Sequence, residues 1–192
     1  MSIGETTWSL ALRFLREGVV HILEGTDHIA FLIAILLPVR KLRQIVQVVT
    51  AFTLAHSITL TAAAAGLADV SPRLIEPAIA VSIIIAAAEN LHGRTQAIGV
   101  RTFYAFGFGL IHGFGFAGSL AESGLPSWGM WPAIGAFNAG VELGQLAIVC
   151  VLAPALALLE RKRPALSPAV VRYASLAIIA AGLTWSIQRI AA

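Results

Sequence analysis

Long apolar stretches separated by short polar segments dominate the chain. Six of them can be read, at residues 27–39, 46–67, 74–91, 103–121, 132–159 and 170–187. They are longer than buried strands usually are, so the pattern predicts helices. About 20 consecutive apolar residues let one helix cross the hydrocarbon core of a bilayer. We therefore predict an all-α bundle with about six transmembrane spans, forming a single domain over residues 1–192.

The segment before the first span has a different pattern. Residues 8–24 mix Arg13, Arg16 and Glu17 with regularly spaced apolar residues. This pattern is typical of an amphipathic helix that lies at the membrane interface or packs beside the bundle. Gly25 permits a break before the short stretch 27–39. Either the two pieces cross the membrane together, or the first stretch re-enters; the pattern leaves both open.

The composition supports lipid as the surrounding solvent. Hydrophobic residues make up 58% of the chain and charged residues 12%, about half the charged fraction of a soluble domain, and the mean hydropathy is +0.84. The net charge of +3 does not indicate nucleic acid, because the basic residues fall between apolar stretches. The single Cys150 excludes an intrachain disulfide and a cysteine-rich metal site.

The basic residues also predict the topology. Alternate loops carry nine of them, which are Arg40, Lys41, Arg43, Arg94, Arg101, Arg161, Lys162, Arg163 and Arg172. The other loops between spans carry only Arg73. Because basic loops stay in the cytoplasm, we expect both termini on the outer side of the inner (plasma) membrane.

Ionisable residues inside the apolar stretches are the candidate site. Such residues are costly in a bilayer, so they usually have a partner or a function. The predicted topology places Asp27, His28, His56, His112 and Glu142 in the outer half of the membrane. Imidazole and carboxylate ligands suit nickel, zinc, cobalt or iron. We predict that these five residues converge and contact a divalent transition metal.

Further polar residues are candidates for supporting roles. His21 and Glu76 lie at the predicted entrance, and Ser57 follows His56 in sequence. Asn138 and Gln145 have the spacing that places them on one helix face with Glu142. Glu89 and His92 lie at the opposite end of their span, where an exit is expected.

Four motifs resemble the HupE/UreJ family of membrane proteins. They are HILEGTDH at residues 21–28, FTLAHSITL at 52–60, FGLIHGFGF at 108–116 and FNAGVELGQ at 137–145. The resemblance extends from about residue 18 to residue 159. The family's histidine–aspartate–histidine motif falls on His21, Asp27 and His28, and its histidine–glycine motif falls on His112 and Gly113. The resemblance implies a permease or accessory protein for nickel, or for cobalt.

Three functions are compatible with the sequence. The first is inward transport of a divalent metal, with nickel favoured and zinc or cobalt as alternatives, in a protein whose partners are the bilayer and the metal ion. The second is a membrane-embedded zinc hydrolase of a lipid or membrane peptide, with Glu142 or Asp27 as general base. The third is a non-catalytic assembly subunit that binds a metal. Association with a second copy or a partner subunit is compatible with each.

Overall fold

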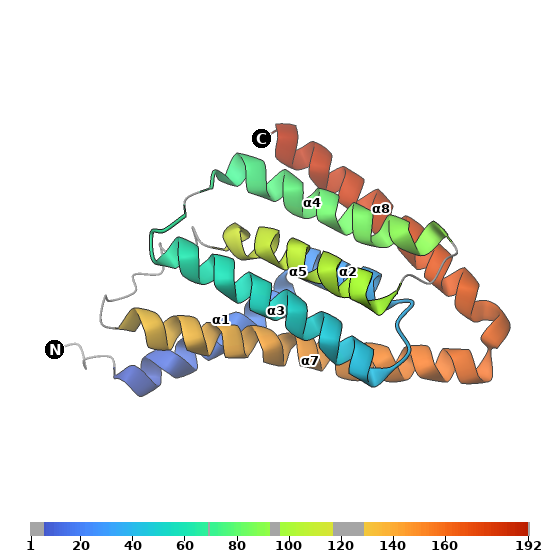
Figure 1. Ribbon diagram of the computed structural model, residues 1–192, viewed down its shortest axis with the longest axis horizontal. Helices are drawn as coiled ribbons and strands as arrows, with labels where there is room; N and C mark the ends of the chain where they lie inside the picture. Colours follow the sequence, from blue (N-terminus) through green and yellow to red (C-terminus); the bar gives the residue numbers. More distant parts are fainter. Residues whose placement is uncertain (1–5, 69, 93–96, 117–128, 192) are drawn as a thin grey trace.

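The computed structural model describes residues 6–68, 70–92, 97–116 and 129–191, and this part of the chain is helical without strands. Its helices are α1 (Thr7–Glu24), α2 (Thr26–Leu36), α3 (Leu42–Ala64), α4 (Pro72–Glu89), α5 (Ile98–Gly115), α7 (Met130–Lys162) and α8 (Ser167–Ala191). Short 3-10 turns follow at η1 (Asn90–His92) and η3 (Pro164–Leu166). The predicted all-α bundle is confirmed (Figure 1).

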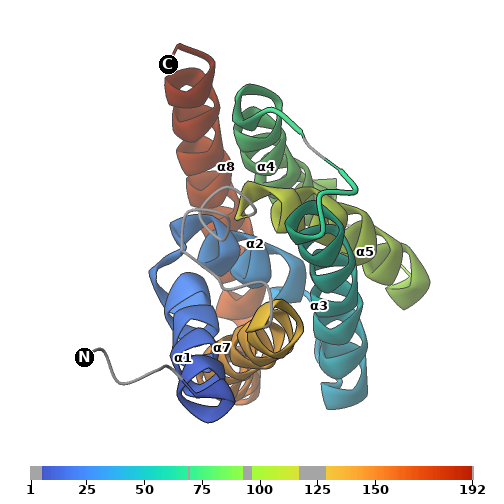
Figure 2. The ribbon, with the colours of Figure 1, turned by 90° about the vertical axis from the view of Figure 1, so that its left-hand side faces the viewer.

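The helices associate mainly in pairs. α1 packs along α7, α3 along α5, and α4 along α8. The short helix α2 lies at the centre, between these pairs (Figure 2), and it contacts α1, α4, α7 and α8. Residues from α2, α3, α4 and α5 form the larger apolar core, and α1 and α7 contribute most of the smaller one. The first turn of α2 therefore lies close to several other helices.

Glycines allow two of these pairs to approach closely. A Cβ on Gly109 of α5 would lie 2.5 Å from the carbonyl oxygen of Phe52 in α3, and one on Gly113 would overlap the backbone at His56. On α7, a Cβ at Gly140 would overlap the backbone of α1. Small residues bring membrane helices together by removing side chains from the interface. The close contact at Gly113 places α5 against α3 next to His112.

The predicted break at Gly25 is present. α1 ends at Glu24, α2 begins at Thr26, and the two helix axes meet at a bend of 67°. A Cβ on Gly25 would lie 2.5 Å from the carbonyl oxygen of His21 and 2.7 Å from Nδ1 of His28. A side chain at this position would therefore push two histidines apart. Glycine is required here for space.

The number of spans depends on how the bent pair is counted. By length and composition, α3, α4 with η1, α7, and α8 with η3 qualify as membrane-spanning helices. These are four spans, or five if α1 and α2 form one broken span. The sequence predicted about six. α5 makes the difference, because its 18 described residues are not among the helices that qualify.

The ends of the helices agree with the predicted pairing of loops. α1 begins and α8 ends toward one end of the bundle, on the left in Figure 1. The connection between α2 and α3, the beginning of α5 and the connection between α7 and α8 lie toward the other end. We call these the terminal end and the arginine end, the latter after Arg40, Arg101 and Arg172. That the terminal end faces outside stays a prediction.

Candidate functional site

Four of the chain's five histidines come together between four helices. They are His21 at the end of α1, His28 at the start of α2, His56 in α3 and His112 in α5. The ring centroid of His28 lies 4.5 Å from that of His21, 5.9 Å from that of His56 and 5.1 Å from that of His112. The centroids of His21 and His56 are 5.9 Å apart. We call this group the histidine cluster.

The histidine cluster is enclosed by aromatic rings. His56 is fully buried, and His112 and His28 are 1% and 9% exposed. The ring of Phe52 stacks on His56, with centroids 6.0 Å apart, and it also contacts His112 at 5.4 Å. Phe116 packs on His21 at 4.4 Å. The imidazoles are thus held in an environment with little water.

Most nitrogens of the cluster lack a hydrogen-bond partner among the described residues. The unpartnered buried atoms are His21 Nε2, His28 Nδ1 and Nε2, His56 Nδ1 and Nε2, and His112 Nδ1. A buried polar atom without a partner costs roughly 1–3 kcal/mol, and such atoms are rare in folded proteins. Six of them in one place therefore call for a functional explanation. Ring nitrogens that bind a metal ion would provide one.

Ser82 of α4 is a hydrogen-bond partner of His112. The Ser82 hydroxyl donates its proton to the carbonyl oxygen of Ile79 at 2.7 Å, and its oxygen lies 3.0 Å from Nε2 of His112. With the serine proton on the Ile79 carbonyl, a neutral His112 in the Nε2–H tautomer would donate to the serine oxygen. This hydrogen bond leaves the lone pair on Nδ1, the unpartnered nitrogen of His112. A partner on one ring nitrogen commonly orients the other for a metal.

Asp27 lies beside the cluster but is paired with an arginine. Its Oδ2 is 2.6 Å from Nη2 of Arg189 in α8, and these side chains are 17% and 23% exposed. Nη1 of Arg189 also donates to the carbonyl oxygen of Glu76, at 3.1 Å. The second carboxylate oxygen, Oδ1, is buried and unpartnered within the described structure. Arg189 thus ties α8 to the first turn of α2 and to Glu76 of α4.

The residues predicted on α7 do not all face the histidines. Gln145 is 2% exposed, and its Oε1 accepts a hydrogen bond of 2.6 Å from the Thr53 hydroxyl of α3. Asn138 is partly buried, and its Oδ1 has no partner in the described part of the chain. Glu142 is exposed. The expected convergence of Glu142 with the histidines is therefore not found.

The packing of α7 explains why Glu142 stands apart. The face of α7 that meets α1 includes Phe137, Val141 and Gly144. Successive residues of an α-helix lie about 100° apart around its axis. Glu142, which follows Val141, is therefore turned to the flank of the helix, away from this contact.

The other predicted residues have local partners. The Ser57 hydroxyl donates to the carbonyl oxygen of Thr53 in the same helix, at 2.7 Å, and the Glu76 side chain is exposed. At the arginine end, Glu89 shares a small cavity with Arg101. His92 is exposed, with Nδ1 3.1 Å from the carbonyl oxygen of Ala88. The predicted entrance and exit roles stay predictions.

The donor set fits a transition metal in chemistry, although the rings are not arranged around one point. Within the described ranges, no group of three or more histidine, cysteine, aspartate or glutamate side chains is placed to hold a metal ion. The imidazoles of His28 and its neighbours meet edge to face, with interplanar angles of 63° to 86°. Cys150 is exposed. Imidazole with a carboxylate nearby is a set that nickel, cobalt and zinc accept.

Comparison with known proteins supports the resemblance of the motifs. A family model described as HupE / UreJ protein matches residues 1–189. No curated protein and no solved structure matches the chain. The family match includes all four histidines of the cluster and both residues of the Asp27–Arg189 ion pair. This chain, a membrane protein of apolar helices, therefore belongs to the HupE/UreJ family.

Proposed function

We propose that this protein moves a divalent transition metal across the inner membrane through the histidine cluster, with nickel as the first candidate cargo. Cobalt and zinc suit the same donors. The family is associated with nickel and cobalt handling, which supports the proposal. The observation that carries it is the group of six buried, unpartnered ring nitrogens on four neighbouring histidines. Placing them in an apolar bundle is costly unless a ligand uses them.

The Asp27–Arg189 ion pair would control entry. A carboxylate at the mouth attracts a cation, whereas an arginine repels it. In this structure Arg189 occupies Oδ2 of Asp27, so an incoming metal must compete with the guanidinium group. When a metal binds Asp27, Arg189 would release Oδ2 of Asp27 and keep only its hydrogen bond to the Glu76 carbonyl. The ion pair would thus keep the entrance closed until a divalent cation displaces Arg189 from Asp27.

The cluster would then bind the metal through a change of ring orientation. Ser82 already leaves Nδ1 of His112 free to act as a ligand. His28 is the ring that contacts the three others, and it stands directly after Asp27 in sequence. Turning the His28 and His56 rings would let their nitrogens face the same ion. A metal could therefore pass from the carboxylate to the imidazoles over a short distance.

Release toward the arginine end requires a larger movement. Beyond the cluster, α2 continues with the buried residues Phe31, Ile35 and Leu36, in an apolar core with little room for an ion. A carrier with this packing would have to open toward the arginine end to release the metal. The break at Gly25 separates α1 from α2 and provides a place where α2 could move relative to α1. Alternating exposure of one site to the two sides is how such a carrier would work.

The hydrolase reading has less support than transport. Glu142, one of the two proposed general bases, is exposed on α7. The other, Asp27, has one carboxylate oxygen occupied by Arg189. A purely structural metal in an assembly subunit would need a closed set of ligands, so it would require the same turning of the rings as transport does.

Uptake measurements on His56→Ala and His112→Ala test the proposal. Each substitution should abolish nickel uptake while the protein stays in the membrane at its normal level. A histidine that only links helices contributes roughly 1–2 kcal/mol in a membrane, so its loss would mainly lower the amount of folded protein. Even an outer partner of a metal site typically changes affinity or activity by about 10–100-fold, and a direct ligand should matter at least as much.

The outcomes separate the three functions. Well-folded variants that accumulate nickel at the wild-type rate would refute transport through the cluster. Normal nickel uptake together with lost cleavage of a membrane substrate would instead support the hydrolase. Nickel bound by the wild-type protein without any uptake would support the assembly subunit.

A further inference from the structure

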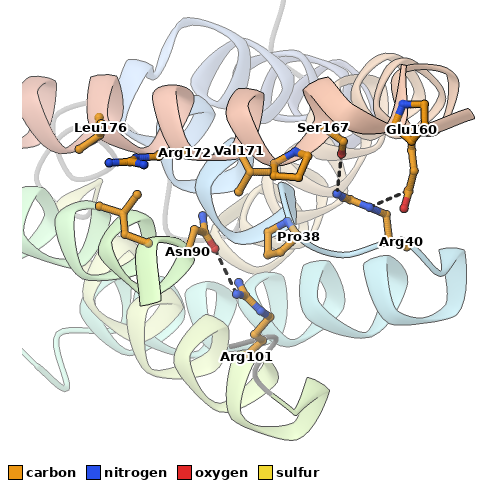
Figure 3. A pocket seen from close by; sticks show the side chains of 12 residues that line it. Pro38, Arg40, Asn90, Arg101, Glu160, Ser167, Val171, Arg172 and Leu176 are labelled. Carbon is orange, nitrogen blue, oxygen red and sulfur yellow. Dashed lines mark hydrogen bonds and ion pairs between the residues drawn. The ribbon is translucent and has the colours of Figure 1, made fainter. Parts of the chain in front are cut away.

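A second polar site lies at the arginine end, away from the histidines. A cavity of about 900 Å³ opens there between the start of α8, the end of α4 and the turn after α2 (Figure 3). This volume is within the range of small-ligand pockets, roughly 300–1,000 Å³. Three arginines from separate parts of the chain line it, namely Arg40, Arg101 and Arg172. The proposed metal route gives these residues no role.

Arg101 is buried and fixed in the wall of this cavity. It is only 5% exposed. Its Nη2 donates to Oδ1 of Asn90 at 3.1 Å, and its Nη1 donates to the carbonyl oxygen of Ile35 at 3.4 Å. Asn90 in turn donates to the carbonyl oxygen of Ala34 at 2.8 Å. Neutral acceptors thus fix this buried guanidinium group in place, and Glu89 lies near enough to offset part of its charge.

Arg40 and Ser167 form the opposite wall. Nε of Arg40 lies 2.7 Å from Oε2 of Glu160, and its Nη2 donates to the Ser167 hydroxyl at 3.3 Å. Ser167 is the first residue of α8. Figure 3 shows Arg40, Ser167 and Glu160 together on one side, with Asn90 and Arg101 on the other.

The charges in and around the cavity are not balanced. Glu160 is neutralised by Arg40, and Glu89 lies beside Arg101 in a small neighbouring cavity. Arg172 is exposed and makes no hydrogen bond or ion pair with the described residues. One guanidinium group is therefore available in a cavity that two others also line, and the fork geometry of guanidinium groups suits phosphate oxygens.

We propose that this cavity binds the phosphate group of an anionic phospholipid. The arginines would hold the phosphate, and the apolar side chains of Val171 and Leu176, one helical turn or less from Arg172, would contact the glycerol and the start of an acyl chain. Leu176 is 43% exposed, so this apolar wall continues onto the outer surface of α8. A small soluble phosphate compound would gain nothing from that wall. Basic pockets between membrane helices are known to receive such head groups.

Native mass spectrometry of the full-length protein in detergent tests this assignment. The probes are phosphatidylglycerol, phosphatidylcholine and inorganic phosphate. Phosphatidylglycerol should bind in preference to phosphatidylcholine, whose choline cation would face the arginines. Arg172→Gln should lower phosphatidylglycerol binding by about ten-fold, as expected for one lost charge-assisted contact. The matched control is Arg161→Gln, which removes the same charge from an exposed position at the same end, outside the cavity.

Each possible result supports or overturns the assignment of the cavity to a phospholipid. A strong effect of Arg172→Gln beside a small effect of Arg161→Gln supports the site. Equal effects of the two variants, or no preference for phosphatidylglycerol, would overturn it. Equal competition by inorganic phosphate at millimolar concentration would retain a phosphate site but overturn its assignment to lipid. Arg172→Lys, which keeps the charge and loses the fork, controls for folding and should show intermediate binding with an unchanged helical circular-dichroism spectrum.

Discussion

Replacing Arg189 by glutamine should raise the affinity of the protein for nickel. In the structure Arg189 holds one oxygen of Asp27, at 2.6 Å, next to the histidine cluster. Glutamine is shorter and neutral, so it removes both the ion pair and the repulsion that an arriving cation meets. The carboxylate would then be available to the metal without a competitor.

The size of the effect follows from the burial of the pair. Hydrogen bonds to charged groups contribute about 1.5–3 kcal/mol. The side chains of Asp27 and Arg189 are 17% and 23% exposed, so partial solvent screening reduces this to about 1–2 kcal/mol. A difference of that size corresponds to roughly a 5–30-fold increase in nickel affinity.

Equilibrium dialysis of radioactive nickel with the purified full-length protein measures this change. A double-mutant cycle with Asp27→Asn identifies its cause. Asp27→Asn should weaken nickel binding, and adding Arg189→Gln to that variant should restore none of it. Arg189 also donates to the Glu76 carbonyl, so a thermal unfolding curve without metal should accompany each measurement to report any loss of stability.

The reasoning would be refuted by two results. One is an unchanged or lower nickel affinity in a folded Arg189→Gln variant. The other is an equal rise in affinity with and without Asp27, because Arg189 would then act through general electrostatics.

Two further predictions concern packing and topology. Gly113→Ala places a Cβ against the α3 backbone and should destabilise the protein by about 1–3 kcal/mol, seen as a lower unfolding temperature. Gly107→Ala on the same helix meets open space and should keep or raise stability; equal losses would contradict the packing argument. In a Cys150→Ser background, a membrane-impermeant thiol reagent added to intact cells should label Thr6→Cys but not Arg163→Cys. The reverse pattern would overturn the orientation.

The histidine cluster was largely accessible to sequence reasoning. Polar residues within apolar stretches stand out, and the charge pattern gave His28, His56 and His112 a common depth. The structure brings these three together. His21 was expected at the entrance, yet its ring packs on His28. The reason is the 67° bend at Gly25, an angle that a hydrophobicity pattern does not contain.

Residues whose position depends on how a helix is rotated about its axis were harder to place from the sequence. The sequence pattern placed Glu142 on one helix face with Asn138 and Gln145, but the packing of α1 on the α7 face that includes Val141 and Gly144 turns it outward. Arg189 was missed because its partner Asp27 lies 162 positions away in the sequence. One sign of its role was that it is a basic residue at the predicted outer end of the last span, where basic residues are usually scarce. Ser82 was missed because a serine in an apolar helix is common.

X-ray absorption at the nickel edge tests the central claim most directly, because it shows whether the metal is bound by the histidine cluster. The wild-type protein loaded with nickel should show several imidazole ligands, and His56→Ala should reduce that signal and the amount of bound nickel. His92→Ala, which removes an exposed histidine at the arginine end, should leave both unchanged. A nickel spectrum with only oxygen ligands, or one that His56→Ala leaves unaltered in a folded protein, would contradict the account.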